Sequence, residues 1–167
     1  MAEPNLTGFI DKARSLRIKL KDGGFSSFGD VMLPTQGDYL NWIANKRRDK
    51  VPAWRFDIKC RQFAAVSTTV GAAITADCMV NGGFDAVVAS HEKTSLNKLS
   101  RMYRLFLGRK EGGKGREKRV SDTLFETPSN SQIELQIADE DLNRSGSVTH
   151  LHFSEADYIT DFQESWR

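Results

Sequence analysis

The sequence has little of what marks secreted, membrane-spanning or zinc-stabilised chains. Its 167 residues include two cysteines, Cys60 and Cys78, and no CxxC pair. That argues against a zinc ribbon or a disulfide scaffold and favours small buried side chains in a reducing compartment. No stretch approaches the roughly 18 apolar residues of a membrane span. The N-terminus has an early acid and no apolar run of signal-peptide length, which argues against secretion.

The remaining composition is that of one soluble domain with an uneven charge. Residues 1–119 hold 22 Lys and Arg against 12 Asp and Glu, whereas residues 120–167 hold 2 against 10. A net +10 followed by a net −8 is compatible with a polyanion bound near the first part, or with an ordinary charged surface.

The apolar pattern predicts an α/β fold with a mainly parallel sheet flanked by helices. We expect an N-terminal basic arm or helix over residues 1–33, in which residues 1–24 have helical spacing. One larger domain is expected over residues 34–167. Within these, the predicted helices are 36–50, 68–80 and 92–107, and the predicted strands are 55–59, 84–90, 123–127, 132–138 and 148–153. Asn81-Gly82-Gly83 has the composition of a helix C-cap, and residues 129–131 that of a hairpin turn.

A basic segment interrupts the larger domain. Residues 108–119 (GRKEGGKGREKR) hold six basic residues, four glycines and no apolar side chain. No core can form from such residues, so we predict a mobile loop. It either is simply solvated or tracks DNA phosphates through Lys114, Arg116, Lys118 and Arg119.

Two stretches have the residue types of a nucleotide-hydrolysing site. Residues 58–69 (IKCRQFAAVSTT) read as strand, small-residue loop, hydroxyl pair and helix, the context of a phosphate-binding loop. Ser67 takes the Ser/Thr position of GxxxxGK[ST], but Val66 replaces its lysine and Ala65 its second glycine, so a plain strand-to-helix turn capped by Ser67 stays open. Residues 150–155 (HLHFSE) form an alternating strand that ends in Glu155, where nucleotide hydrolases place the acid that orients the attacking water. His150 and His152 share one strand face and could ligate a metal with Cys60, although ordinary strand histidines are the simpler interpretation.

Together these stretches resemble the large terminase subunits of tailed bacteriophages, the ATP-driven motors that package DNA. Many members carry a displaced phosphate loop like K-x-R-Q-x-G-x-S-T, seen here as KCRQFAAVST over 59–68. A segment like G-R-x-x-T-x-x-H-L-H-L-S-E-x-A corresponds to NRSGSVTHLHFSEA over 143–156. PTQGDY at 34–39 is similar to the family's adenine-contacting glutamine region, and VVASH at 87–91 to its second strand.

The resemblance implies a truncated P-loop NTPase-like fold, ATP and Mg²⁺ as cofactors, and a role for each matching residue. Gln36 would contact adenine, and Lys59 or Arg61 would supply the phosphate-bridging cation. Ser67 would bind Mg²⁺, and Glu155 would be the catalytic carboxylate. The other implied positions are Gln62, Ala65, Val66 and Thr68 at the nucleotide, Ser154 weakly at the metal, and Arg144 as a possible coupling residue.

Departures from the family pattern keep an alternative open. The spacing from Arg61-Gln62 to Ser67 is one residue longer, and alanine replaces the loop glycine, which disfavours a close phosphate where φ is positive. The chain ends twelve residues past Glu155, before the coupling motif and nuclease domain of large terminases, so we expect the N-terminal part of the ATPase alone. A catalytically weak or inactive fragment that binds DNA or the portal is the alternative, and a helicase-like motor is disfavoured by the HLHFSE segment.

The resemblance also implies partners and a location. They are double-stranded viral DNA, the procapsid portal, the small terminase subunit and further copies in a homo-oligomeric ring, in the cytoplasm of an infected bacterium. No membrane partner is expected.

Overall fold

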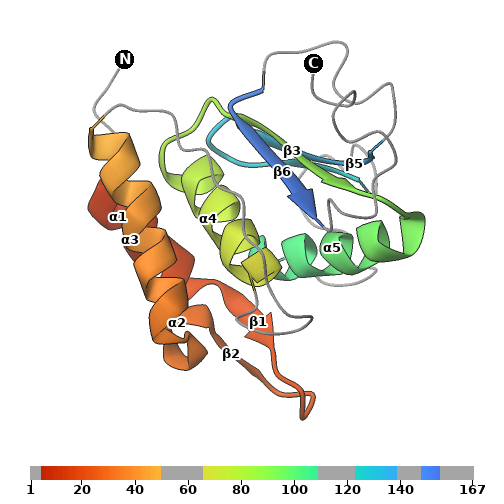
Figure 1. Ribbon diagram of the computed structural model, residues 1–167, viewed down its shortest axis with the longest axis horizontal. Helices are drawn as coiled ribbons and strands as arrows, with labels where there is room; N and C mark the ends of the chain where they lie inside the picture. The colour runs from red at the N-terminus through yellow and green to blue at the C-terminus, as the bar shows by residue number, and fades with distance from the viewer. Residues whose placement is uncertain (1–4, 50–65, 109–122, 139–147, 155–167) are drawn as a thin grey trace.

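The computed structural model is an α/β fold with a mixed sheet flanked by helices (Figure 1). It describes residues 5–49, 66–108, 123–138 and 148–154. The strands of the main sheet follow the order β4 (Leu124–Glu126), β5 (Gln132–Ile137), β3 (Asp85–Ser90) and β6 (His150–Ser154). β3 runs parallel to both β5 and β6, and β4 runs antiparallel to β5. The predicted strands at 84–90, 123–127, 132–138 and 148–153 and their mainly parallel pairing are confirmed, with one antiparallel edge strand.

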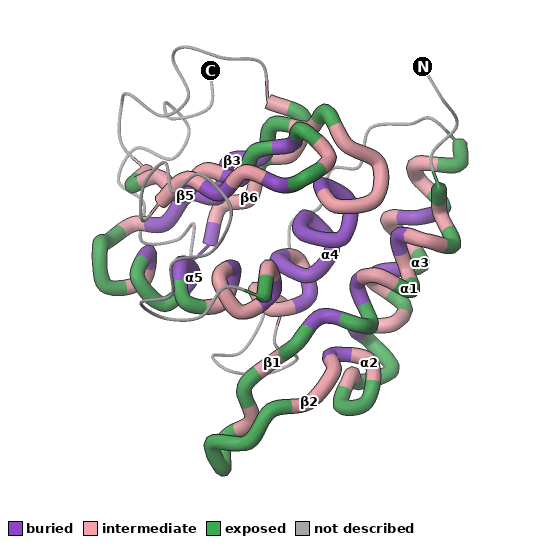
Figure 2. Tube along the Cα trace, turned by 180° about the vertical axis from the view of Figure 1, so that it is seen from behind, coloured by how far each residue is buried: buried purple, intermediate pink, exposed green. Residues whose placement is uncertain are grey.

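Helix α4 (Val66–Val80) is the buried centre of the molecule. Nine of its residues are buried, and Figure 2 shows most of its length in the colour of buried residues. A helix that is apolar on all sides requires neighbours on all sides, and α4 has the sheet on one side and the N-terminal helices on the other. Asn81-Gly82-Gly83 ends it as predicted. Gly82 has φ +70°, and a Cβ there would lie 2.6 Å from the carbonyl oxygen of Ser129.

Helix α5 (Lys93–Phe106) covers the same face of the sheet as α4. Its inward residues are the ones predicted from the 3.6-residue period, and Leu96, Leu99, Tyr103 and Phe106 are all buried. Tyr103 is stacked on Phe125 of β4, with ring centroids 6.3 Å apart. The predicted hairpin turn between β4 and β5 is also confirmed, because Asn130 adopts φ 63°, the left-handed conformation that such a turn needs.

The N-terminal segment differs in part from the prediction. Helix α1 (Leu6–Ser15) ends nine residues earlier than the helical spacing indicated, and β1 (Arg17–Lys19) pairs with β2 (Phe25–Ser27) in a separate antiparallel hairpin. The alternation Arg-Ile-Lys and the glycine pair favour this hairpin, since Gly23 has φ +88° in its turn. A short helix, α2 (Phe28–Val31), replaces the expected loop.

Helix α3 (Pro34–Arg48) matches the predicted helix and packs with α1 against α4. Phe9 and Ala13 of α1 and Leu40 and Ala44 of α3 are buried in the same core as α4. The predicted strand 55–59 and residues 109–119 of the predicted mobile loop lie outside the described residues. None of the described helices is long and apolar enough to cross a membrane.

Candidate functional site

The first turn of α4 and the end of β6 lie at the same edge of the sheet. Near the end of α4, Asp77 lies against His150 at the start of β6, with Oδ2 and Nε2 2.7 Å apart. Going back from Asp77 to Ser67 covers ten helical residues, roughly 15 Å, and going from His150 to Ser154 covers four strand residues, roughly 13 Å. α4 runs opposite to β6 (Figure 1). Ser67 and Ser154 are therefore at similar heights along the sheet.

We call this the carboxyl edge, the edge at which β3 and β6 end at Ser90 and Ser154. These two serines are register partners. Val88 of β3 packs in the core with α4, and because side chains alternate along a strand, Ser90 two residues on faces the same way. Ser90 is fully buried, and its Oγ has no hydrogen-bond partner among the described residues. Buried polar atoms are nearly always paired, so this hydroxyl is a polar group whose partner the described residues do not supply.

Gln36 lies beside the first turn of α4. Its Oε1 accepts a hydrogen bond from the Leu33 N–H (2.8 Å), and its Nε2 donates to Oγ1 of Thr69 (2.9 Å). The first bond caps α3, since Gln36 is the third residue of that helix. The second bond ties α3 to α4 two residues after Ser67. Gln36 is 4% exposed, and among the described residues these two bonds use one lone pair and one N–H of its amide.

The remaining predicted residues divide into two groups. Val66, Ser67 and Thr68 form the half-buried first turn of α4. Outside the described residues lie Lys59, Arg61, Gln62, Ala65, Lys114, Arg116, Lys118, Arg119, Arg144 and Glu155. The structure thus places Gln36, Val66, Ser67, Thr68 and Ser154 toward one edge, and the roles of the residues in both groups stay predictions.

The opposite edge, which we call the amino edge, holds a buried polar network that sequence reasoning missed. Both guanidinium nitrogens of Arg47, from α3, contact the carboxylate of Asp77, which is 1% exposed. Nε2 of His150 lies 2.6 Å from Arg47 and 2.7 Å from Asp77, and Asn81 donates to Oδ1 of Asp77 at 2.7 Å. The network joins α3, α4 and β6. The signal that could have found it is Asp77 itself, the one charge in an otherwise uncharged helix, because a buried carboxylate needs a partner.

His150 fits this network as a neutral ring. Thr149 Oγ1 donates to the carbonyl of Asp85 (2.8 Å), so it accepts from Nδ1 of His150 at 3.1 Å. Nε2 lies between the guanidinium of Arg47, which donates, and the carboxylate of Asp77, which accepts. Burial, and next the charge of Arg47, lower the pKa of His150 to about 4. Burial also lowers the pKa of Arg47 to about 10, which leaves it charged at neutral pH.

Aromatic rings enclose the guanidinium of Arg47. Its central carbon lies 5.4 Å from the ring centroid of Phe84 and 5.8 Å from that of Phe9. Phe84 also meets His150 edge to face, at 5.2 Å between centroids. Such packing removes the cation from water, so Asp77 is its essential counter-charge.

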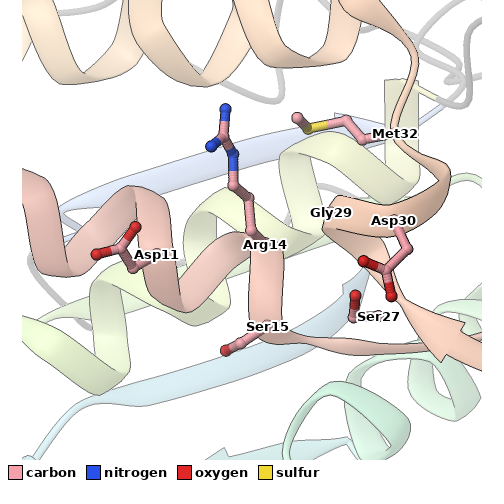
Figure 3. Close-up of a pocket in the computed structure, with 7 residues that line it drawn as sticks. All are labelled: Asp11, Arg14, Ser15, Ser27, Gly29, Asp30 and Met32. Carbon is pink, nitrogen blue, oxygen red and sulfur yellow. The ribbon is translucent and has the colours of Figure 1, made fainter.

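A shallow groove of about 560 Å³ lies elsewhere, between α1 and the segment from β2 to α2. Figure 3 shows Arg14 projecting from α1, with Asp11 on one side and Asp30 on the other. Gly29 permits the close approach of the two segments, because a Cβ there would lie 2.9 Å from Cβ of Arg14. The groove contains none of the predicted nucleotide-site residues.

Metal ligation by the predicted histidines has no support in the described part of the chain. No group of three His, Cys, Asp or Glu side chains there is placed to hold a metal ion. His150 instead contacts Arg47 and Asp77, and Cys60 lies outside the described residues. Cys78 is buried as predicted, and burial raises the pKa of its thiol to about 12.

No protein-family model matches this sequence, and comparison with curated proteins finds no match.

Proposed function

We propose that this chain is the ATP-binding and ATP-hydrolysing part of a bacteriophage large terminase subunit, with a P-loop-type nucleotide site at the carboxyl edge. The hydrogen bond from Gln36 to Thr69 is the observation that carries the proposal. It places the glutamine of the PTQGDY segment against the first turn of the helix that follows the phosphate-loop-like segment. A residue of one motif thus contacts the residue that directly follows the other motif, 33 positions away in sequence.

The direction of the elements also supports this proposal. β3 and β6 are adjacent and parallel. α4 directly precedes β3 in the chain and runs in the opposite direction. Open α/β sheets bind ligands at the carboxyl ends of their strands, where such a helix begins. The positive end of the α4 dipole and its first N–H groups suit a phosphate.

The chain has suitable residues for ATP and Mg²⁺ at this edge. Ser67, half-buried in the first turn of α4, would hold Mg²⁺, and the buried hydroxyl of Ser90, which has no partner among the described residues, is a further polar group at this edge. Mg²⁺ would supply charge stabilisation at the phosphates. In the same proposal Lys59 or Arg61 positions the phosphates, and Glu155, which directly follows Ser154, accepts a proton from the attacking water.

The test is magnesium-dependent ATP binding and turnover by the chain and by two variants. Glu155→Gln should keep ATP affinity and lower turnover by about 10²–10⁴-fold, because the amide cannot accept the proton. Lys59→Ala should weaken binding as well, since it removes a phosphate-facing charge. Asp157→Asn is the matched control, and it should behave as the parent chain does.

Loss of turnover in Asp157→Asn but not in Glu155→Gln would reassign the base. Binding with no turnover in any variant would favour the second candidate, a non-catalytic module that contacts DNA or the portal. Ala65 is the observation that favours this candidate, because alanine disfavours the close backbone approach that a phosphate loop needs. An absence of ATP binding would overturn the proposed nucleotide site.

A further inference from the structure

The β1–β2 hairpin presents a basic and aromatic face that the proposed nucleotide site does not use. Arg17 and Lys19 lie on one face of β1, and Phe25 lies on the same face of β2, directly opposite Lys19. Lys21 follows two residues on, in the turn. We call Arg17, Lys19, Lys21 and Phe25 the hairpin face. All four residues are exposed, and the hairpin projects away from the main sheet (Figure 1).

The hairpin is anchored through its other face. Ile18, between Arg17 and Lys19, packs against the hydrophobic core. Phe28, immediately after β2, is buried and donates its N–H to the carbonyl of Leu16 at 2.7 Å. The turn is closed by the bond from the Leu20 N–H to the Gly24 carbonyl, 2.8 Å. The hairpin face is therefore held outward by ordered backbone.

Phe25 distinguishes this face from an ordinary charged surface. An aromatic residue that served only to anchor the hairpin would point inward, as Ile18 does, yet Phe25 is 50% exposed. The guanidinium carbon of Arg17 lies 4.0 Å from its ring centroid, within cation–π distance. The hairpin thus offers an aromatic ring with cations on both sides along the strand direction.

The charge around this ring is positive. Asp22 is the one carboxylate within the hairpin, and its Oδ1 accepts the Gly24 N–H at 2.9 Å in the turn. Asp30 accepts a long hydrogen bond from Ser26, the register partner of Ile18, so it lies with the face opposite to Phe25. Against these, the hairpin face carries the three cations Arg17, Lys19 and Lys21.

We propose that the hairpin face binds single-stranded nucleic acid, with a base stacked on Phe25 and the flanking phosphates on Lys19, Lys21 and Arg17. Proteins that bind single strands combine aromatic rings, on which bases stack, with a cationic track for the backbone. An acidic polypeptide would use the cations alone, and the exposed part of the Phe25 ring would not contact it. The hairpin therefore fits an unpaired strand better than an acidic peptide.

The experiment is fluorescence anisotropy of a labelled oligothymidine of about 20 nucleotides, beyond the roughly 4–16 that one binding module covers, with the full chain and no ATP. Phe25→Leu keeps an apolar side chain but removes the ring, and it should weaken binding roughly 5-fold to 100-fold without changing the salt dependence. Phe25→Tyr should retain the affinity. Lys19→Gln with Lys21→Gln should lower the slope of log affinity against log salt by about 1.4, because two phosphate contacts are lost.

Lys93→Gln with Lys98→Gln is the matched control. It removes the same charge from the exposed side of α5 and should leave the slope unchanged. Absence of binding by the parent chain, parent-like binding by Phe25→Leu, or an equal loss in the α5 control would each overturn the proposal. Competition by polyglutamate as effective as that by unlabelled oligothymidine would also overturn it, in favour of an acidic polypeptide. Because ATP is absent, the outcome is independent of the proposed nucleotide site.

Discussion

The two edges of the sheet differ in how completely their buried polar groups are paired. At the amino edge, Asp77 receives hydrogen bonds from Arg47 and Asn81 and also lies against His150, so every partner comes from the protein. At the carboxyl edge, Ser90 is equally buried, but its hydroxyl has no partner among the described residues. Both edges contact α4, the first near its end and the second at its beginning.

This difference separates a structural cluster from a candidate binding site. A network whose charges are satisfied internally holds α3, α4 and β6 together. At the carboxyl edge, the hydroxyl of Ser90 has no partner among the described residues, and the first N–H groups of a helix are available to a ligand. The charged cluster at the amino edge is chemically the more conspicuous of the two. The carboxyl edge is nevertheless the better candidate for a binding site.

Removal of Asp77 should have the largest effect on stability. Asp77→Ala leaves the half-buried cation of Arg47 without its counter-charge, which should lower the free energy of unfolding by up to about 3–5 kcal/mol. Urea unfolding followed by circular dichroism measures this change. Asp85→Asn, an exposed carboxylate at the same edge, is the control and should change stability by no more than about 0.5 kcal/mol. A loss of less than about 1 kcal/mol in Asp77→Ala would contradict a structural role for the amino edge.

Lowering the pH should reduce the stability of the folded chain through His150 at the amino edge. The pKa of His150 is about 4 in the folded chain and about 6.5 when unfolded, so the unfolded chain takes up the proton first as pH falls. The stability that the neutral ring contributes is complete above pH 6.5 and is lost progressively toward pH 4, by roughly 3 kcal/mol in total. The unfolding free energies of the parent and of His150→Gln should be measured from pH 7 to pH 4. The difference between them should change by that amount, because only the parent carries the titrating ring. Parallel curves would show that His150 does not titrate in this way.

Gln36 should combine a moderate structural effect with an effect on the ligand. Gln36→Leu removes the cap on the Leu33 N–H and the bond to Thr69, and should lower the free energy of unfolding by about 1–3 kcal/mol. If the amide contacts adenine, the variant should also lose the preference for ATP over GTP in a binding assay. Asn41→Leu, an exposed position of the same helix, is the control for both measurements. A retained nucleotide preference would leave Gln36 with its structural role only.

Replacement of Ser90 should have the smallest effect on stability. Its effect on ATP binding should be the most informative of the set. Ser90→Ala removes a buried hydroxyl that has no described partner, so stability without ligand should stay the same or rise by up to about 1 kcal/mol. ATP binding should nevertheless weaken. Tyr103→Phe removes the other hydroxyl that is fully buried and unpaired in the described part of the chain, away from this edge, and should leave ATP binding unchanged. Equal ATP affinity in both variants would remove the functional distinction between the two edges.

The fold was more predictable from the sequence than the site. The inward faces of α5, the C-cap at Gly82 and the turn at Asn130 follow from local periodicity and from backbone conformations that few residues adopt. The hairpin of β1 and β2 was missed because its strands are three residues long, too short to show a period, and its sequence continues the helical spacing of α1. Pattern reasoning resolves long elements better than short ones for this reason.

The sequence by itself determined the long helices and the strands of the main sheet, and which short motifs resemble a nucleotide hydrolase. Both depend on neighbouring residues, whose chemistry is visible along the chain. Only the tertiary structure decided that Arg47, Asp77 and His150 meet, although 103 positions separate the first from the last. It also brought Gln36 to the first turn of α4 and left the hydroxyl of Ser90 without a partner in the part of the chain that is described. The physical reason is that a buried polar group requires a partner but its own sequence does not say which one, since the packing of helices on the sheet selects it.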